Sequence, residues 1–307
     1  MSADSLRSLG DILYQVLLPI ILMAGAGFLL RRKIDLDPRS VNRIVYFVLS
    51  PCLVYASILT LEFNPDITGR SILFAALDML VLGGAAYWLT RRWGYQGGLA
   101  SAFIITTILM NNGNYGLPLN LFAFGETGFA YALVLFMFNA MFGGAISIYL
   151  AIRGHDNRLA ALKRTLMQPI ILAMLLGVIS RFTHIAPTGS LFNMIDMAGK
   201  AAIPVFLLVL GMTLAQTDIR ANVKPVLQLT TLRMFVSPLV ALALASVVGL
   251  SGVAYSVAVL QASMPTAVNS IVITNEFDAA PDFTAGAVLM TTLASLVTLP
   301  ILLFFLR

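Results

Sequence analysis

Long apolar segments, separated by short polar stretches, follow one another along the whole chain. A membrane-spanning helix needs about 20 mainly apolar residues. We predict ten such helices, at residues 11–30, 41–60, 70–90, 97–124, 127–150, 167–183, 193–215, 224–249, 251–277 and 282–306. The expected fold class is therefore an all-α integral membrane protein, with one polar loop at residues 153–166 in the middle of the chain.

Two of these segments contain residues that interrupt helices. The fourth includes 110-MNNGNYGLPLN-120 and the ninth includes 261-QASMPTAVNS-270. Gly costs about 1 kcal/mol and Pro about 3 kcal/mol relative to Ala inside a helix. Pro118 and Pro265 also lack the amide hydrogen that a helix needs. Inside a membrane, backbone groups freed by a break must find partners in protein or water. We therefore expect both helices to be broken near these prolines, beside a polar cavity.

The composition agrees with a membrane location. Hydrophobic residues make up 59% of the chain and charged residues 11%, whereas a soluble domain carries roughly 25% charged residues. So few charges cannot cover a surface that faces water. The first apolar run is long enough to span a membrane and is followed by Arg31, Arg32 and Lys33, which favours a retained helix over a cleaved signal peptide.

Positive residues are distributed unevenly between the predicted loops. Most Lys and Arg residues follow odd-numbered helices, whereas Arg7, Arg70, Arg181, Lys200 and Arg307 fall on the other side. Cytoplasmic loops carry the excess of positive charge. We expect both termini on the non-cytoplasmic side of the cell (inner) membrane. The net charge of +5 reflects this bias, and we expect no nucleic-acid partner.

The two halves of the chain resemble each other. The segments 19-PIILMAGAGFLLR-31 and 169-PIILAMLLGVISR-181 share six residues at one constant offset, and the two predicted breaks fall at corresponding positions. Each half has five predicted helices, an odd number, so the second copy has to enter the membrane in the opposite direction. We predict a 5+5 inverted repeat formed by residues 1–152 and 167–307, an arrangement found in many secondary transporters.

The matched breaks also indicate a binding site, since broken helices at equivalent repeat positions are the best sequence sign of one. A half-helix that begins at a break directs free N–H groups and its positive end into the site, which favours an anion. A single kink would more simply serve packing. The candidate substrate-binding residues are Asn111, Asn112, Asn114, Pro118, Pro265, Thr266, Asn269 and Ser270.

Asp78 lies in the middle of the predicted segment 70–90, and Arg233 lies about nine residues into the predicted segment 224–249. Charge in lipid is costly, so such residues face the protein interior and are candidates for function. Burial disfavours the charge of a carboxylate, and Asp78 is therefore the candidate proton-coupling residue, with Arg233 in support. The alternative is a purely structural Asp78–Arg233 ion pair.

Several motifs resemble those of a known family. NNGNYGLPL resembles the N-x-G-x-x-G-x-P motif of the auxin efflux carrier family, and MPTAVNSIVITNEF resembles the crossover in the ninth helix of that family. The segment 200-KAAIPVFLLVLGMTL-214 is similar to the seventh helix, and the similarity covers essentially the whole chain. Bacterial members of the family include malonate-carrier-like proteins.

This resemblance implies that helices 4 and 9 cross at their prolines. It implies a scaffold of helices 1, 2, 6 and 7 and a transport domain of helices 3–5 and 8–10 that moves like an elevator, usually in a homodimer. Asn111 matches the motif asparagine, Pro118 and Pro265 match the crossover prolines, and Asp78 matches a recurring third-helix aspartate. The long cytoplasmic loop of the plant members is absent, a departure from the auxin-specific carriers.

We therefore expect a secondary carrier that moves a small organic anion, a mono- or dicarboxylate, outward and with proton coupling. Sodium is an alternative coupling ion, because exposed carbonyls at the breaks can coordinate it. An anion channel or a membrane sensor with the same crossover site is a second alternative. The chain has no HExxH, GxSxG or phosphate-binding loop, so we expect neither an enzyme nor a metal or cofactor.

Overall fold

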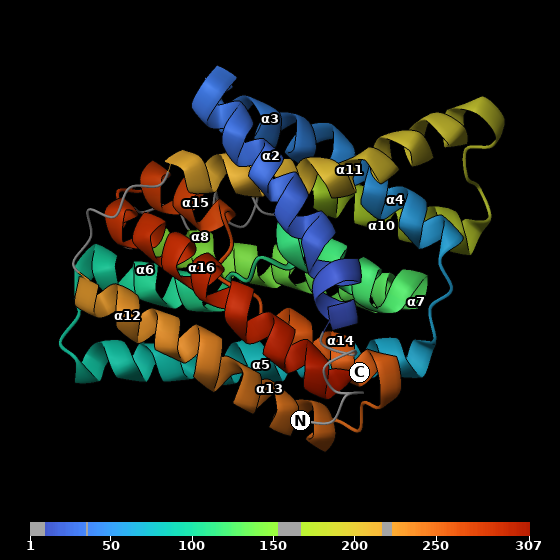
Figure 1. Ribbon diagram of the computed structural model, residues 1–307. Helices are drawn as coiled ribbons and strands as arrows, with labels where there is room; N and C mark the ends of the chain where they lie inside the picture. The colour runs from blue at the N-terminus through green and yellow to red at the C-terminus, as the bar shows by residue number, and fades with distance from the viewer. Residues whose placement is uncertain (1–9, 35, 153–166, 217–222) are drawn as a thin grey trace.

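The computed structural model describes residues 10–34, 36–152, 167–216 and 223–307, and their regular elements are helices (Figure 1). The label η marks a turn of π-helix, in which each N–H bonds to the carbonyl five residues earlier. Before residue 153 the elements are η1 (Ile12–Leu17), α2 (Leu18–Ile34), α3 (Pro38–Ile44), η2 (Val45–Leu49), α4 (Ser50–Thr60), α5 (Pro65–Arg92), α6 (Gly97–Ile108), η3 (Asn112–Gly116), α7 (Leu117–Phe138), η4 (Asn139–Gly143) and α8 (Gly144–Ala151). After residue 166 they are α10 (Pro169–Thr183), α11 (Gly189–Gln216), α12 (Val223–Thr231), η5 (Leu232–Val236), α13 (Ser237–Val247), α14 (Gly252–Ala262), α15 (Asn269–Glu276) and α16 (Pro281–Leu306).

The prediction of an all-α membrane protein is confirmed. Within the described ranges, 7 helical runs are long and apolar enough to cross a membrane, and α6, α10 and α14 are shorter apolar helices. Large apolar side chains such as Leu80, Phe182 and Phe305 point outward from these helices, as expected for surfaces that meet lipid. The chain is thus a multi-pass membrane protein. The predicted loop at residues 153–166 lies outside the described residues.

The longest run, from Asn112 to Ala151, is divided at Gly125. This residue has φ 65° and ψ −157° within α7, a conformation that glycine adopts at little cost and other residues avoid. The division falls between the two segments predicted at 97–124 and 127–150. Glycine at this position therefore lets the chain leave one apolar helix and begin the next without an intervening loop.

Helices α2, α3, α4, α10 and α11 lie together at the top of the view in Figure 1. Glycines bring their backbones close together. A methyl group added at Gly27 or Gly211 would overlap backbone atoms where α2 crosses α11. One added at Gly199 would lie 2.9 Å from the Cα of Leu53, where α11 meets α4. Small residues allow this close packing between helices in a membrane.

Most of the remaining helices lie below this group in Figure 1, and one buried apolar cluster joins α5, α6, α12 and α16. Phe103 on α6 stacks on Phe283 of α16, with ring centroids 6.0 Å apart and the ring planes 18° from parallel. Ala86 of α5 and Leu229 of α12 belong to the same buried cluster. Side chains from both halves of the sequence thereby form one core.

Two interruptions separate short helices at the centre of the molecule. The first lies between Ile108 of α6 and Asn112 of η3, and the second lies between Ala262 of α14 and Asn269 of α15. Pro265 is in the second interruption, as predicted.

The prediction that the first break lies near Pro118 is wrong, because Pro118 is in the first turn of α7, inside a continuous helical run. In the preceding π-turn the N–H of Leu117 bonds to the carbonyl of Asn112. This wide turn, together with a position at the start of the next helix, accommodates a residue without an amide hydrogen.

Candidate functional site

The two interruptions cross and bond to each other. The backbone N–H of Asn111 donates to the carbonyl oxygen of Pro265 at 2.8 Å, and the N–H of Ala267 donates to the carbonyl of Leu109 at 2.9 Å. Met110 and Thr266 face each other between these bonds as an antiparallel pair. Freed backbone groups inside a membrane need such partners, and each break supplies them for the other.

Two hydroxyl residues of the predicted site serve this crossing. The Thr266 hydroxyl donates to the carbonyl of Thr106 at 2.9 Å, and the Thr266 N–H donates to the hydroxyl of Thr291 at 3.1 Å. The Ser270 hydroxyl donates to the carbonyl of Ala267 at 2.6 Å. Both Thr266 and Ser270 are fully buried. The contacts of Thr266 therefore fix the second break relative to α6 and α16, whereas the contact of Ser270 joins the break to the start of α15.

A cleft of about 660 Å³ adjoins the crossing. Three of the predicted site residues, Asn111, Asn114 and Asn269, line it together. Other polar lining residues are Asn42, Arg43, Ser50, Asn139, Gln168 and Glu276, and the aromatic ones are Tyr46, Phe47, Phe136, Phe206 and Phe277. The volume falls in the range of pockets that hold small organic molecules, roughly 300–1,000 Å³. Pro118, Pro265, Thr266 and Ser270 are not among the lining residues.

Two helices begin at this cleft. η3, which continues into α7, starts at Asn112, and α15 starts at Asn269. The first N–H groups of a helix have no acceptor within it, and the helix dipole adds partial positive charge at this end. The side-chain nitrogen of Asn111 also has no hydrogen-bond partner among the described residues, although the residue is only 3% exposed. The cleft therefore offers neutral donors to a negatively charged group.

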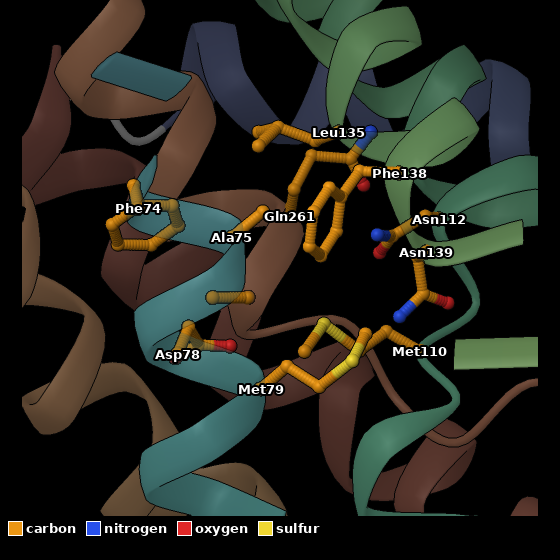
Figure 2. A pocket seen from close by; sticks show the side chains of 11 residues that line it. Phe74, Ala75, Asp78, Met79, Met110, Asn112, Leu135, Phe138, Asn139 and Gln261 are labelled. Atoms are coloured by element: carbon orange, nitrogen blue, oxygen red, sulfur yellow. The ribbon is translucent and has the colours of Figure 1, made fainter. Parts of the chain in front are cut away.

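A second, much smaller cavity of about 20 Å³ lies around Asp78 (Figure 2). Asp78 of α5 lies on one side of it, and Asn112 and Asn139 lie on the opposite side. Gln261, near the end of α14, completes its polar lining. Space for one water needs roughly 10–15 Å³ of such volume, so the cavity accommodates a single water molecule.

The polar atoms around this small cavity are mostly acceptors without donors. Both carboxylate oxygens of Asp78, the side-chain oxygen of Asn112 and that of Gln261 accept no hydrogen bond from the described residues. All three side chains are at most 3% exposed. Buried acceptors of this kind are costly unless a donor meets them. A water molecule in the cavity, or a proton on Asp78, would supply the missing hydrogen-bond donor.

Asn139 connects the two cavities. It lines both the cleft and the small cavity, and its side-chain nitrogen donates to the carbonyl of Ile108, the last residue of α6, at 2.8 Å. Sequence reasoning did not place Asn139 or Gln261 in the site. Both are single amides in otherwise apolar helices. Gln261 lies near the end of α14, just before the second break. This position is the one sequence feature that could have indicated that Gln261 belongs to the site.

Arg233 is fully buried in η5. Its guanidinium donates to the hydroxyl of Ser237 at 3.1 Å, to the carbonyl of Ala262 at 3.0 Å and to the carbonyl of Met264. Arg233 and Asp78 share no hydrogen bond, although the charge of each acts on the other through the protein interior. The two residues therefore do not form a direct structural ion pair.

Broken helices that cross beside a cleft define a class of membrane protein, because secondary transporters bind substrate and ions at such interruptions. The comparisons with known proteins agree with this class. The family model described as "Membrane transport protein" matches residues 157–303. An uncharacterized transporter of Methanothermobacter thermautotrophicus is 28% identical over 295 residues, which is 94% of this chain and 96% of that protein.

Two further relatives carry transporter names. A protein of Rhizobium meliloti, provisionally named a malonate transporter, is 30% identical over 205 residues, 64% of each chain. An uncharacterized transporter of Methanocaldococcus jannaschii is 22% identical over 272 residues, 84% of this chain and 86% of that protein. The chain is thus similar to membrane transport proteins over most of its length, in agreement with the resemblance of its motifs to the auxin efflux carrier family.

Proposed function

We propose that this transporter is a secondary active carrier that exports a small organic anion, a mono- or dicarboxylate, by elevator-type alternating access coupled to protons. One observation carries the proposal. Two broken helices from opposite halves of the chain cross through the Asn111–Pro265 hydrogen bond, beside a cleft lined by free amide side chains. The name of the Rhizobium relative supports a dicarboxylate within this substrate class.

The proposed anion site combines neutral groups. Asn111, Asn114 and Asn269 offer amide donors, and the helix ends at the start of η3 and α15 add partial positive charge. Neutral donors hold a carboxylate without forming a contact ion pair that would be slow to release. Reversible binding of this kind suits a carrier, whose substrate has to leave on the other side.

We propose a 5+5 inverted repeat of residues 1–152 and 167–307. The antiparallel pairing of Met110 with Thr266 supports it, because two equivalent breaks meet in opposite directions. The proposed scaffold of helices 1, 2, 6 and 7 corresponds to α2, α4, α10 and α11, whose close contacts at glycines support a rigid unit. Helices 3–5 and 8–10 carry the crossing and form the proposed moving domain. A homodimer is part of the same proposal.

The residues that line the cleft indicate the side of the membrane to which we propose that it opens. Arg43 lies in the first part of the helical run Pro38–Thr60, Gln168 directly precedes α10, and Glu276 is the last residue of α15. The distribution of Lys and Arg assigns these helix ends to the cytoplasmic side of the cell membrane, with both termini opposite. We propose that the described conformation is open to the cytoplasm, where a carrier for export receives its substrate.

Asp78 is the proposed proton-coupling residue. It is buried, its oxygens lack donors among the described residues, and its cavity meets the cleft at Asn139. A proton on Asp78 would supply a donor to the neighbouring amide oxygen of Asn112 or Gln261. Asn112 directly follows Asn111 in the chain. A change in the protonation of Asp78 would therefore reach the substrate site through Asn112.

Counterflow of labelled malonate in proteoliposomes tests the carrier. A carrier exchanges substrate across the membrane, so unlabelled malonate inside should drive transient accumulation of labelled malonate above equilibrium. A channel would equilibrate the label without this overshoot, and a sensor would not move it. Either outcome would reject the proposed function.

A further inference from the structure

The carbonyl groups at the end of α14 are already occupied. The last residues of a helix leave carbonyl oxygens without intrahelical donors, and the helix dipole places partial negative charge there. At this end Arg233 donates to the carbonyls of Ala262 and Met264. The hydroxyl of Ser237 also donates to the Ala262 carbonyl, at 2.8 Å. A guanidinium therefore fills the position in which transporters with broken helices often place a metal cation.

The equivalent end of α6 is occupied as well, but by neutral donors. Asn139 donates to the carbonyl of Ile108 at 2.8 Å, and Thr266 donates to the carbonyl of Thr106 at 2.9 Å. The carbonyls of Thr106 and Ile108 at one break, and those of Ala262 and Met264 at the other, thus already have protein donors. Displacing these donors would leave a buried amide or guanidinium without partners, which is unfavourable.

The charge balance points in the same direction. Arg233 is 0% exposed and Asp78 is 1% exposed, and each is the charged group that acts on the other. The remaining residues around the small cavity are uncharged. With Asp78 ionised, the pair is neutral as a whole. A bound metal ion would add a second buried cation that has to lose its water, whereas a proton on Asp78 removes a buried charge and leaves Arg233 as the one ion of the pair.

We propose that Arg233 is the fixed cation of the crossover and that substrate binding and transport therefore require no sodium or other metal ion. Arg233 acts as a positioning residue, because it holds the end of α14 and does not line either cavity. The unpartnered acceptors of Asp78, Asn112 and Gln261 are then matched by a water molecule and a proton. This inference rests on the proposed carrier function and identifies the coupling ion that the site admits.

The test compares sodium chloride with choline chloride at equal ionic strength, using labelled malonate as the probe. Counterflow by the wild-type protein should proceed at the same rate, within twofold, in both salts. The thermal stability of the purified protein without substrate should also be the same in both. A tenfold loss of counterflow in choline, or stabilisation of the wild-type protein specific to sodium, overturns the inference.

Arg233→Gln removes the cation and should make the site respond to sodium. We expect the variant to lose counterflow in choline and to be stabilised specifically by sodium, whereas Arg233→Lys should behave like the wild-type protein. Full sodium-independent counterflow by Arg233→Gln contradicts the inference. If this variant does not fold, the wild-type comparison of the two salts decides alone.

Arg181 offers a matched control, because its guanidinium also caps helix carbonyls, those of Ile58 and of Leu61 at 2.8 Å, away from the crossover. Arg181→Gln should lower stability equally in both salts, and a sodium response in this variant would contradict the inference. Absence of malonate counterflow in both salts would reject the proposed carrier of malonate. The effect of sodium on thermal stability would still decide the role of Arg233.

Discussion

The backbone N–H of Asn111 donates to the carbonyl oxygen of Pro265 at 2.8 Å and so joins the two halves of the chain at their breaks. The bond satisfies backbone groups that would otherwise be unpaired within the membrane. Because the breaks bond to each other through backbone atoms, the side chain of Asn111 stays available, and its nitrogen has no partner among the described residues. The crossing thus stabilises the fold and presents a free donor to the cleft.

The close contact between α2 and α11 predicts that alanine substitutions at two nearby glycines have different effects on stability. A methyl group at Gly211 would overlap the backbone carbonyl of Ala24, whereas one at Gly25 meets nothing within 4 Å. Gly211→Ala should lower the free energy of unfolding by about 1–3 kcal/mol, because two backbones would have to separate. Gly25→Ala should leave it unchanged or raise it by up to about 1 kcal/mol, as expected for alanine in a helix. Reversible unfolding in mixed micelles measures both, and equal values would reject the close crossing.

Asp78→Asn tests proton coupling. The variant keeps the shape of the side chain and an acceptor oxygen but cannot release or bind a proton. We expect malonate counterflow to become independent of pH over the range in which the wild-type rate changes. Asp66→Asn is the control, since Asp66 lies on the same helix but is exposed and pairs with Arg70 at 2.9 Å. Unchanged pH dependence in Asp78→Asn would remove the coupling role.

Asp37 caps the start of α3, and we predict that its carboxylate makes the stability of the protein depend slightly on pH. Its carboxylate accepts hydrogen bonds from the N–H of Arg39 at 3.1 Å and the hydroxyl of Ser40 at 3.2 Å. The bond from Arg39, chiefly, lowers the pKa of Asp37 from its ordinary value of 3.8. The folded pKa lies below the unfolded one, so the stabilisation is fully present above pH 3.8 and is lost as the pH falls through the lowered pKa.

Asp37→Asn keeps a capping side chain without the titrating charge. The wild-type protein should therefore be more stable than this variant at neutral pH, and the difference should disappear in acid. Thermal unfolding at several pH values measures it. A difference that stays constant with pH would contradict the assigned role of the Asp37 carboxylate.

Much of the helical framework could be predicted from the sequence, because lipid requires long apolar segments with internal backbone bonds. The segment predicted at 282–306 corresponds to α16, Pro281–Leu306, and the second break contains Pro265 as expected. Local composition was sufficient there. The buried position of Asp78 could also be predicted, since a carboxylate in the middle of an apolar helix faces the protein interior.

Other features depend on tertiary structure and could not be predicted. Pro118 interrupts no helix, because the wide π-turn before it accommodates the missing amide. Thr266 and Ser270 face buried carbonyls instead of the cleft, and the sequence pattern does not distinguish these directions. The cleft and the Asp78 cavity meet at Met110 and Asn139, which come from the first interruption and from η4. Only their packing reveals that both line the two spaces.

The proposed transport depends on the binding of an anion at the amides of the crossing. Its most direct test is thermal stabilisation of the purified protein by malonate and a panel of mono- and dicarboxylates, because a ligand stabilises the state that it binds. Asn111→Ala and Asn269→Ala remove cleft amides, whereas Asn275→Ala removes an exposed amide that bonds within α15 and does not line the cleft.

We predict that malonate or another carboxylate stabilises the wild-type protein and Asn275→Ala to the same degree. Asn111→Ala and Asn269→Ala should each bind at least tenfold more weakly, which removes about 1.4 kcal/mol of binding free energy. An anion site at these amides is contradicted if no carboxylate stabilises the wild-type protein, or if Asn111→Ala responds to the ligand as the wild-type protein does.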